Sequence, residues 1–295
     1  MTVITNHAVR LHAFLALSML AVSGTPLVAQ ESDSKVVEAA RQVEADLDAR
    51  VGLHIHDTGT GESWQYRAGE RFPMVSTFKV LACGALLARA DAGQEDTGRL
   101  VEIEQRDLVS YAPVTERRVG EKMSLHALCE ATMRTSDNTA ANKVLDALGG
   151  PEAGTRFARS LGDETTRLDR RETALNEGTP GDPRDTTSPA AMAETLRRLV
   201  LGDALSAGSR AQLTRWLVDN EVGGPLLRAG IPADWRIGDR TGAGGHGTRG
   251  VVAVLWPPHR APLIAAVYIT GTKASMDERN AAIARIGKAL AETMR

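Results

Sequence analysis

The feature that most constrains this chain is a short turn that runs directly into a long apolar segment. Pro73 suits the approach to a helix, and residues 80–88 are apolar at helical spacing, so a helix is expected to begin between them. Ser76 and Lys79 then lie three residues apart on one face of its first turn. A serine beside an amine that can accept its proton is an activated nucleophile, and N–H groups at a helix start can hold an oxyanion. Alone the pattern is weak and favours the simpler interpretation, in which Ser76 is a helix cap and Lys79 is a solvated side chain.

The composition and the N-terminus predict an exported globular protein. The 295 residues are 42% hydrophobic and 24% charged, and the net charge of −2 gives no basic surface for nucleic acid. Residues 1–29 resemble a secretory signal peptide, because Arg10 is the only charged residue before Glu31 and the apolar run 13–22 is too short to span a bilayer. Cleavage after Ala29 leaves a soluble protein, periplasmic or secreted, with a net charge of −3. An uncleaved membrane anchor is the alternative.

Two cysteines, Cys83 and Cys129, leave two interpretations open. An even number of cysteines in an exported protein favours a disulfide, which on the chain-entropy model would contribute ~4 kcal/mol. Alternatively, both are buried free thiols, since each lies in an apolar helical pattern. Neither a C-x-x-C motif nor a partner histidine accompanies them, which argues against a metal site. His54 and His56 also do not indicate a metal, because strand alternation already places both on one face.

The order of the expected elements predicts an α/β domain interrupted by an all-helical one. Strands are expected at 51–56, 63–66, 235–241, 251–256 and 263–270. Helices are expected at 34–49, 124–133, 138–148, 151–161, from 188, and at 209–219 and 277–294. Residues 163–187 instead form a long charged loop, and such loops are often functional. We therefore assign 30–68 and 219–295 to a discontinuous α/β domain and 69–218 to the all-helical domain.

Four short motifs follow one another along the chain. They are Ser76-x-x-Lys79, Ser136-Asp137-Asn138, Glu172-x-x-Leu175-Asn176 and Arg240-Thr241-Gly242. Each alone could be a helix cap, a solvated loop acid or a strand end. Together and in this order they resemble the class A β-lactamases, over essentially all of the mature chain. The resemblance implies an antiparallel sheet flanked by helices, with an inserted helical domain.

The resemblance also implies a mechanism. Ser76 would attack the β-lactam carbonyl and form an acyl-enzyme, while the N–H groups of Ser76 and Ala243 hold the oxyanion. Either Lys79, or Glu172 through a water, would take the serine proton. Glu172 would then activate the water that hydrolyses the ester, and Ser136 would relay a proton to the departing ring nitrogen.

The remaining implied roles concern binding and support. Asn138 would bind the acyl amide of the substrate, Asn176 would help to hold the hydrolytic water, and Tyr111 would line the cleft entrance. The full set expected to bind substrate is Tyr111, Asn138, Asn176, Arg240, Thr241, Gly242, Ala243 and Arg249. Arg170 and Asp185 would bridge the two ends of the loop that carries Glu172. Relatives often have a disulfide at the positions of Cys83 and Cys129.

One departure from the family pattern refines the expected substrate. Arg240 stands where most of the family has lysine, and arginine offers a planar fork that cannot be deprotonated. Arginine here is similar to the carbenicillin-hydrolysing subgroup, so a penicillinase that also accepts carboxypenicillins is expected. Carbapenem turnover is not expected, because Val75 precedes the nucleophile where carbapenem-hydrolysing relatives often have cysteine.

Three other classes remain as alternatives. A penicillin-binding peptidase or β-lactam sensor would share the first motifs but trap the acyl-enzyme. Glu172 argues against this class, because it supplies a base for deacylation. A non-catalytic exported binding protein would have to keep four motifs without use. A generic serine esterase lacks support, because no G-x-S-x-G motif is present. No motif implies a metal, nucleotide or flavin cofactor, and we expect a monomer whose partner is a small β-lactam.

Overall fold

A computed structural model describes residues 1–3 and 34–295, and its centre is a five-stranded sheet. The strand order is β2-β1-β9-β8-β7, and each neighbouring pair is antiparallel. The strands are β1 (Arg50–Asp57), β2 (Ser63–Tyr66), β7 (Arg236–Ala243), β8 (Arg249–Trp256) and β9 (Leu263–Thr270). The antiparallel sheet expected from the sequence is thereby confirmed. The expected signal peptide lies outside the described residues apart from residues 1–3.

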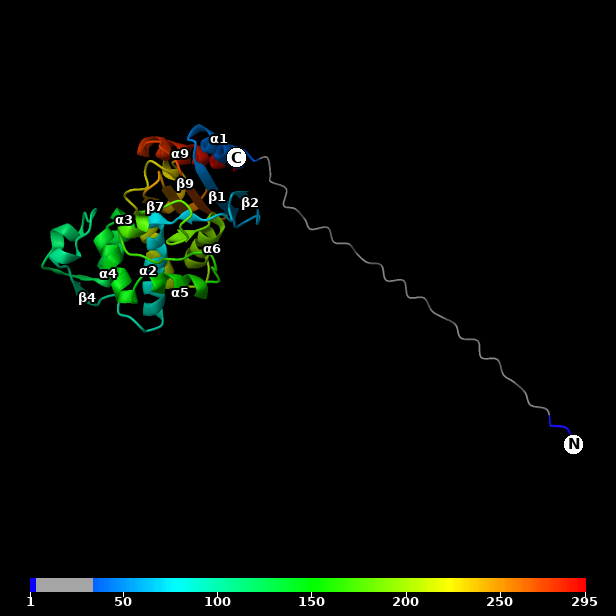
Figure 1. Cartoon of the computed structure of the whole chain (residues 1–295), viewed down its shortest axis with the longest axis horizontal. Coiled ribbons are helices and arrows are strands. Elements are labelled where there is room, and N and C mark those ends of the chain that lie inside the picture. Colours follow the sequence, from blue (N-terminus) through cyan, green and yellow to red (C-terminus); the bar gives the residue numbers. More distant parts are fainter. Residues whose placement is uncertain (4–33) are drawn as a thin grey trace. The chain divides into compact units, whose positions relative to one another are not determined.

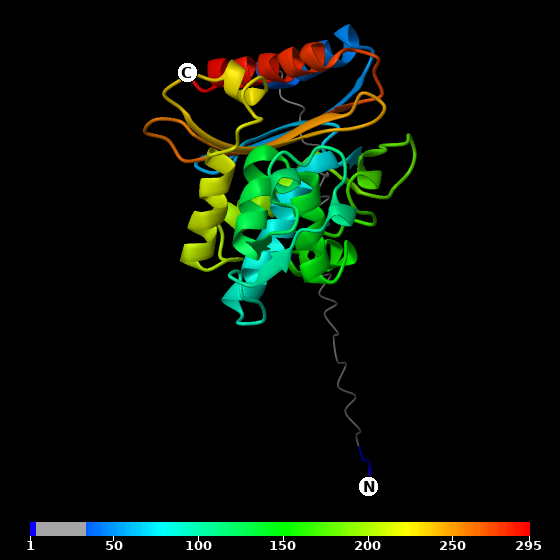
Figure 2. The same ribbon diagram turned by 90° about the vertical axis from the view of Figure 1, so that its left-hand side faces the viewer.

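Helices cover both faces of the sheet, as Figure 2 shows with the sheet edge-on. On one face lie α1 (Lys35–Asp46) and α9 (Met276–Thr293), whose apolar stripes pack on alternate residues of the strands. The opposite face and its helices form a second apolar core. Because both faces are covered, β9 is buried at every position, which explains its continuous apolar sequence.

The helical side is built around α2 (Phe78–Asp91), which lies among the other helices in Figure 1. This helix is buried from Phe78 to Leu87. A helix that is apolar all round belongs inside a protein, so its neighbours must surround it. These neighbours are α3 (Leu125–Thr135), α4 (Asn138–Leu148), α5 (Glu152–Ser160), α6 (Pro189–Val200) and α7 (Ala207–Val218).

Polar side chains fix where several of these helices begin. Ser124, Asp137, Ser188 and Ser206 each accept a hydrogen bond from a backbone N–H in the first turn of the helix that follows. Such caps satisfy donors that would otherwise be unpaired. The cap pattern explains why helix starts near 124, 138 and 188 could be expected from the sequence.

Several short elements did not appear in the sequence prediction. Two-residue and three-residue strands pair as β3 (Phe72–Pro73) with β6 (Thr186–Thr187) and as β4 (Leu100–Glu102) with β5 (Lys122–Ser124). A four-residue helix, α8 (Leu227–Gly230), packs against α9. Elements this short contain too few residues to show a period, so only tertiary contacts define them.

The two cysteines form a disulfide between α2 and α3, with Cα atoms 5.8 Å apart. This geometry favours the disulfide over the two free thiols that the sequence left open as the alternative.

Within the described residues, no helix is both long and apolar enough to cross a membrane.

Candidate active site

The candidate nucleophile lies at the start of the buried helix α2. Ser76 belongs to a 3₁₀ turn, Val75–Thr77, and α2 begins two residues later, so Ser76 lies just before the helix rather than inside its first turn. Val75 has a φ of +44°, which is strained for a β-branched residue. The hydroxyl of Thr77 donates to the carbonyl of Met74 at 2.7 Å and contacts the hydroxyl of Tyr268 at 2.9 Å. These contacts hold the turn.

Ser76, Lys79 and Glu172 converge beneath the surface of the cleft. The Ser76 hydroxyl donates to Oε1 of Glu172 at 3.3 Å, and Nζ of Lys79 lies 3.0 Å from the same oxygen. The side chains of Lys79 and Glu172 are both fully buried. Glu172, which lies 96 positions after Ser76 in the sequence, thus joins Ser76 and Lys79 in one polar cluster in which the serine hydroxyl contacts a carboxylate.

The environment of Lys79 lowers its affinity for a proton relative to an exposed lysine. Burial lowers the pKa of the Lys79 ammonium to about 8, and the positive charge of Arg240 acts in the same direction. The carboxylate of Glu172 opposes this shift, because a nearby negative charge favours the ammonium. A lysine with this pKa can exchange a proton near neutral pH.

Ser136 and Asn138 bring the second motif to the same lysine. Nζ of Lys79 donates to the backbone carbonyl of Ser136 at 2.9 Å, to its hydroxyl at 3.2 Å and to Oδ1 of Asn138 at 2.7 Å. Asn138 Nδ2 donates to the carbonyl of Ser110 at 2.9 Å. Asn138 therefore also braces Lys79 and the 110–111 segment from the first residue of α4.

Arg240 lies fully buried on β7 and reaches across the site to Ser136. Its Nη2 donates to the Ser136 hydroxyl and its Nη1 donates to the carbonyl of Thr241 at 2.9 Å. Burial lowers the pKa of Arg240 to about 10, which still leaves the guanidinium charged at neutral pH. The Ser136 hydroxyl thus lies between two cationic side chains, and of these only Lys79 can give up a proton.

Glycines allow β7 to approach the nucleophile closely. A Cβ on Gly242 would lie 2.4 Å from Cγ2 of Val75 and 2.8 Å from the backbone nitrogen of Ser76, so no other residue fits there. A Cβ on Gly244 would lie 2.5 Å from the carbonyl oxygen of Asn176. The third motif and the turn after it therefore pack against both the nucleophile turn and the loop that carries Glu172.

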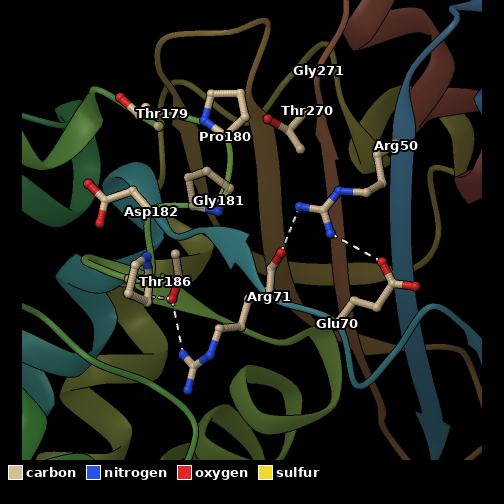
Figure 3. Close-up of a pocket in the computed structure, with 13 residues that line it drawn as sticks. Arg50, Glu70, Arg71, Thr179, Pro180, Gly181, Asp182, Thr186, Thr270 and Gly271 are labelled. Carbon is tan, nitrogen blue, oxygen red and sulfur yellow. Dashed lines mark hydrogen bonds and ion pairs between the residues drawn. The ribbon is translucent and has the colours of Figure 1, made fainter.

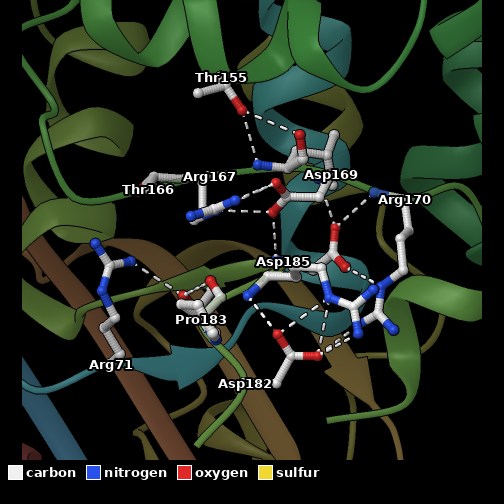
Figure 4. Close-up of polar contacts among 12 residues, drawn as sticks. Arg71, Thr155, Thr166, Arg167, Asp169, Arg170, Asp182, Pro183 and Asp185 are labelled. Carbon is white, nitrogen blue, oxygen red and sulfur yellow. Dashed lines mark hydrogen bonds and ion pairs between the residues drawn. The ribbon is translucent and has the colours of Figure 1, made fainter. Parts of the chain in front are cut away.

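We call residues 163–187 the Glu172 loop, and an ion pair joins its two ends (Figure 4). Nε of Arg170 donates to Oδ2 of Asp185 at 2.6 Å, and the backbone N–H groups of Asp169 and Arg170 donate to Oδ1 at 2.7 and 2.9 Å. Asp185 is 1% exposed. The bridge between Arg170 and Asp185 that the resemblance implied is therefore present as an ion pair.

Asn142, a residue that the sequence prediction missed, binds the backbone of Glu172. Oδ1 of Asn142 accepts from the backbone N–H of Glu172 at 2.9 Å, and its Nδ2 donates to the Glu172 carbonyl at 2.9 Å. Nδ2 of Asn176 donates to Oε2 of Glu172 at 2.5 Å. Asn142 follows Asn138 by one helical turn on α4, so a polar residue one turn after the second motif was the available signal.

The outer side of the Glu172 loop faces a second hollow, of about 450 Å³ (Figure 3). Arg50 and Arg71 form its opposite wall, and their hydrogen bonds are satisfied internally. Arg50 bonds Glu70 and the carbonyl of Arg71, while Arg71 bonds the Thr186 hydroxyl at 3.0 Å. This hollow contains none of the motif residues.

The cleft above the polar cluster has a volume of about 420 Å³. It is lined by the expected catalytic residues Ser76 and Ser136. It is also lined by all but Arg240 of the residues expected to bind substrate, namely Tyr111, Asn138, Asn176, Thr241, Gly242, Ala243 and Arg249. Lys79, Glu172 and Arg240 are buried beneath this lining. Val222 and Met276 also line the cleft and were missed, because no local pattern marks them. Among the described residues, no cluster of three or more His, Cys, Asp or Glu side chains could hold a metal ion.

The fold and the cleft define a serine hydrolase site of the kind found in β-lactamases, and comparisons with known proteins agree. A profile of the β-lactamase enzyme family matches residues 35–294. The chain is 51% identical over 271 residues to β-lactamase AER-1 of Aeromonas hydrophila, covering 92% of this chain and 89% of the relative. It is 48% identical over 279 residues to β-lactamase PSE-4 of Pseudomonas aeruginosa, and the match covers 94% of this chain and 96% of the relative.

Solved structures give the same result. An ancestral class A β-lactamase is 55% identical and superposes with a TM-score of 0.86 over 87% of this chain and 99% of its own. The chain therefore belongs to the class A β-lactamases, and it hydrolyses the β-lactam amide bond.

Proposed function

We propose that Ser76 is the nucleophile and that the enzyme acts through an acyl-enzyme. The observation that carries this proposal is the single oxygen of Glu172 that contacts both the Ser76 hydroxyl, at 3.3 Å, and Lys79, at 3.0 Å. As the serine oxygen bonds to the carbonyl carbon, its proton passes to Lys79, or to Glu172 through a water. The N–H groups of Ser76 and Ala243 stabilise the oxyanion, which the close approach of β7 at Gly242 supports.

The β-lactam C–N bond then breaks, and the ring nitrogen takes a proton from Ser136. Lys79 resupplies that proton, because its Nζ lies 3.2 Å from the Ser136 hydroxyl and its pKa is about 8. Arg240 holds the same hydroxyl but remains charged, so in this enzyme it orients Ser136 without exchanging a proton.

Deacylation depends on Glu172 as a general base. The carboxylate removes a proton from a water that attacks the ester carbonyl, and Ser76 leaves with its proton restored. Asn176 supports the proposal, because it donates to Oε2 of Glu172 while its own Oδ1 is a buried acceptor without a protein partner. That oxygen can accept a hydrogen bond from the attacking water.

We propose that the substrates include carboxypenicillins such as carbenicillin. Arg249 lines the cleft, and its Nε donates to Asn280 at 2.8 Å. Burial, followed by the charge of Arg279, lowers the pKa of Arg249 to about 10, so it is cationic at neutral pH together with Arg240. Two buried guanidinium groups near one cleft attract a dianionic penicillin more than a monoanionic one.

Three further residues of the cleft are proposed to bind the rest of the substrate. Thr241 offers a hydroxyl to the ring carboxylate, Asn138 offers an amide to the acyl group, and Tyr111 offers an exposed ring at the entrance.

The test is a comparison of carbenicillin and benzylpenicillin as substrates of the purified enzyme. We expect kcat/KM for carbenicillin within about tenfold of that for benzylpenicillin, because the extra carboxylate meets a cationic cleft. Carbenicillin turnover far below that of benzylpenicillin would reject the carboxypenicillin proposal and leave β-lactam hydrolysis itself untouched.

We propose further that the chain is exported after loss of residues 1–29 and acts as a monomer. The description of 30–68 and 219–295 as an α/β part and of 69–218 as a helical part is likewise proposed. It is supported by the two apolar cores on opposite faces of the sheet. Under this division the nucleophile lies in the helical part and Arg240 in the α/β part.

A further inference from the structure

A third hollow, of about 430 Å³, differs from both the catalytic cleft and the hollow beside the Glu172 loop. It lies where the end of α6, α7, the start of β7 and the end of β8 meet. In Figure 2, α7 is the yellow-green helix beside the sheet. Arg210 and Arg215 enter the lining from α7, Arg236 from β7 and Trp256 from β8. A volume of this size is typical of sites that hold small molecules.

The charged residues that line this hollow are all of one sign. Its lining includes three arginines and no acidic residue, and α7 itself contains no acid. None of the three guanidinium groups forms an ion pair with a described residue, whereas Arg228, nearby in sequence, pairs with Asp239 at 2.8 Å. The whole chain carries a net charge of −2, so this basic hollow is a local exception.

The three arginines keep donors available. Arg215 makes one long hydrogen bond, from Nη1 to Gln212 at 3.4 Å. Arg210 uses Nη1 to donate to the carbonyls of Gly202 and Leu205, which anchors the side chain and leaves its other nitrogens free of described partners. Each guanidinium therefore still presents a fork that can bind two oxygens of one anion.

An aromatic ring holds the third arginine in place. Arg236 and Trp256 are opposite one another in the β7–β8 register, and the Arg236 guanidinium lies 4.5 Å from the centre of the indole ring. A cation stacked in this way is ordered without losing its hydrogen-bond donors. Val200 and Leu201 add an apolar wall.

We propose that this hollow is a binding site for a multiply charged oxyanion of phosphate chemistry. Two of the guanidinium groups come from α7 and the third from β7, and like charges that line one hollow are stabilised by an anion bound between them. Planar forks suit phosphate oxygens, and one multivalent anion can satisfy several forks at once. The ligand could come from solution as a phosphate compound or from a membrane as a phospholipid headgroup, and both present the same chemistry.

Pyrophosphate is the probe for the first experiment, by isothermal titration calorimetry with the full mature enzyme at low ionic strength. We expect saturable binding at one site, weakened at least tenfold in the double variant Arg215→Gln/Arg236→Gln. Arg117→Gln is the matched control, since Arg117 is exposed, forms no ion pair with a described residue and does not line this hollow. Unchanged benzylpenicillin turnover and unfolding temperature in each variant show that the fold is intact.

Co-sedimentation with phosphatidylglycerol vesicles separates the two sources. Binding to pyrophosphate alone assigns the site to soluble phosphates, and vesicle binding that the double variant loses assigns it to a headgroup. The proposal is overturned if neither probe binds saturably, or if the double variant binds both probes as well as the control variant does.

Discussion

Nζ of Lys79 lies 3.0 Å from Oε1 of Glu172, and both side chains are completely buried. The two candidate bases for Ser76 are thus in direct contact, so a proton taken by one is shared with the other. Burying such a pair costs free energy that a folded protein can avoid with apolar residues, which indicates that its purpose here is chemical.

The pH dependence of acylation should reveal which member of the pair acts. In Glu172→Gln only Lys79 remains as a base, and we expect the rate of acylation to rise with pH. Since the Glu172 carboxylate raises the pKa of Lys79, its loss should place the midpoint below the value of about 8 for the intact site. Quenched-flow mass spectrometry of adduct formation with benzylpenicillin measures this rate. A profile that is flat with pH would exclude Lys79 as the base.

Arg240→Lys should change substrate preference more than overall activity. Lysine keeps a positive charge but loses the fork that donates to both Ser136 and Thr241. We expect KM for carbenicillin to rise about tenfold, with a smaller rise for benzylpenicillin. Arg236→Lys, an exposed position on the same strand, serves as control in steady-state kinetics. Equal effects of Arg240→Lys on both substrates would contradict a special role for the fork.

The bridge between Arg170 and Asp185 should hold the Glu172 loop. Asp185→Ala removes the acceptor of two backbone N–H groups and of Arg170, so we expect a loss of about 3–5 kcal/mol in the free energy of unfolding. Arg184→Ala breaks a half-exposed pair with Asp182 and should cost no more than about 1 kcal/mol. Urea unfolding measures both variants. Similar losses of unfolding free energy in the two variants would show that the buried bridge stabilises the fold no more than an exposed ion pair does.

His54 should contribute to acid sensitivity. Burial lowers its pKa to about 4, helped by the charge of neighbouring His56, and its Nδ1 has no hydrogen-bond partner. Between pH 6.5 and 4 the folded state therefore binds fewer protons at His54 than the unfolded state, so stability falls as the pH falls. Relative to His54→Gln, the unmodified enzyme should lose on the order of 1–3 kcal/mol across this window. Parallel stability curves from urea unfolding at several pH values would contradict this.

Local sequence signals were sufficient for the long elements of the fold. The alternating and apolar runs predicted the five sheet strands, and capping residues such as Ser188 predicted helix starts. The placement of Ser76 before α2, instead of within it, depends on the strained Val75 turn, which packing against Gly242 maintains. That packing is a contact between residues far apart in the chain, and no local pattern reports it.

The parts of the site that were missed are all defined by tertiary contacts. Asn142 holds the backbone of Glu172 across 30 positions of sequence, and Tyr268 reaches Thr77 from β9. Met276 and Val222 reach the cleft from the start of α9 and from a connecting segment. Residues of this kind have ordinary local surroundings, so only the folded chain shows what they contact.

The most direct test of the account is the fate of benzylpenicillin in the Glu172→Ala variant. We would follow drug loss by absorbance and the intact protein by quenched mass spectrometry, beside the unmodified enzyme. We expect many turnovers per molecule for the unmodified enzyme and a stoichiometric covalent adduct on Ser76 for the variant, because acylation proceeds while deacylation lacks its base. Rapid turnover by the variant without any adduct, or an adduct on a residue other than Ser76, would contradict the proposed mechanism.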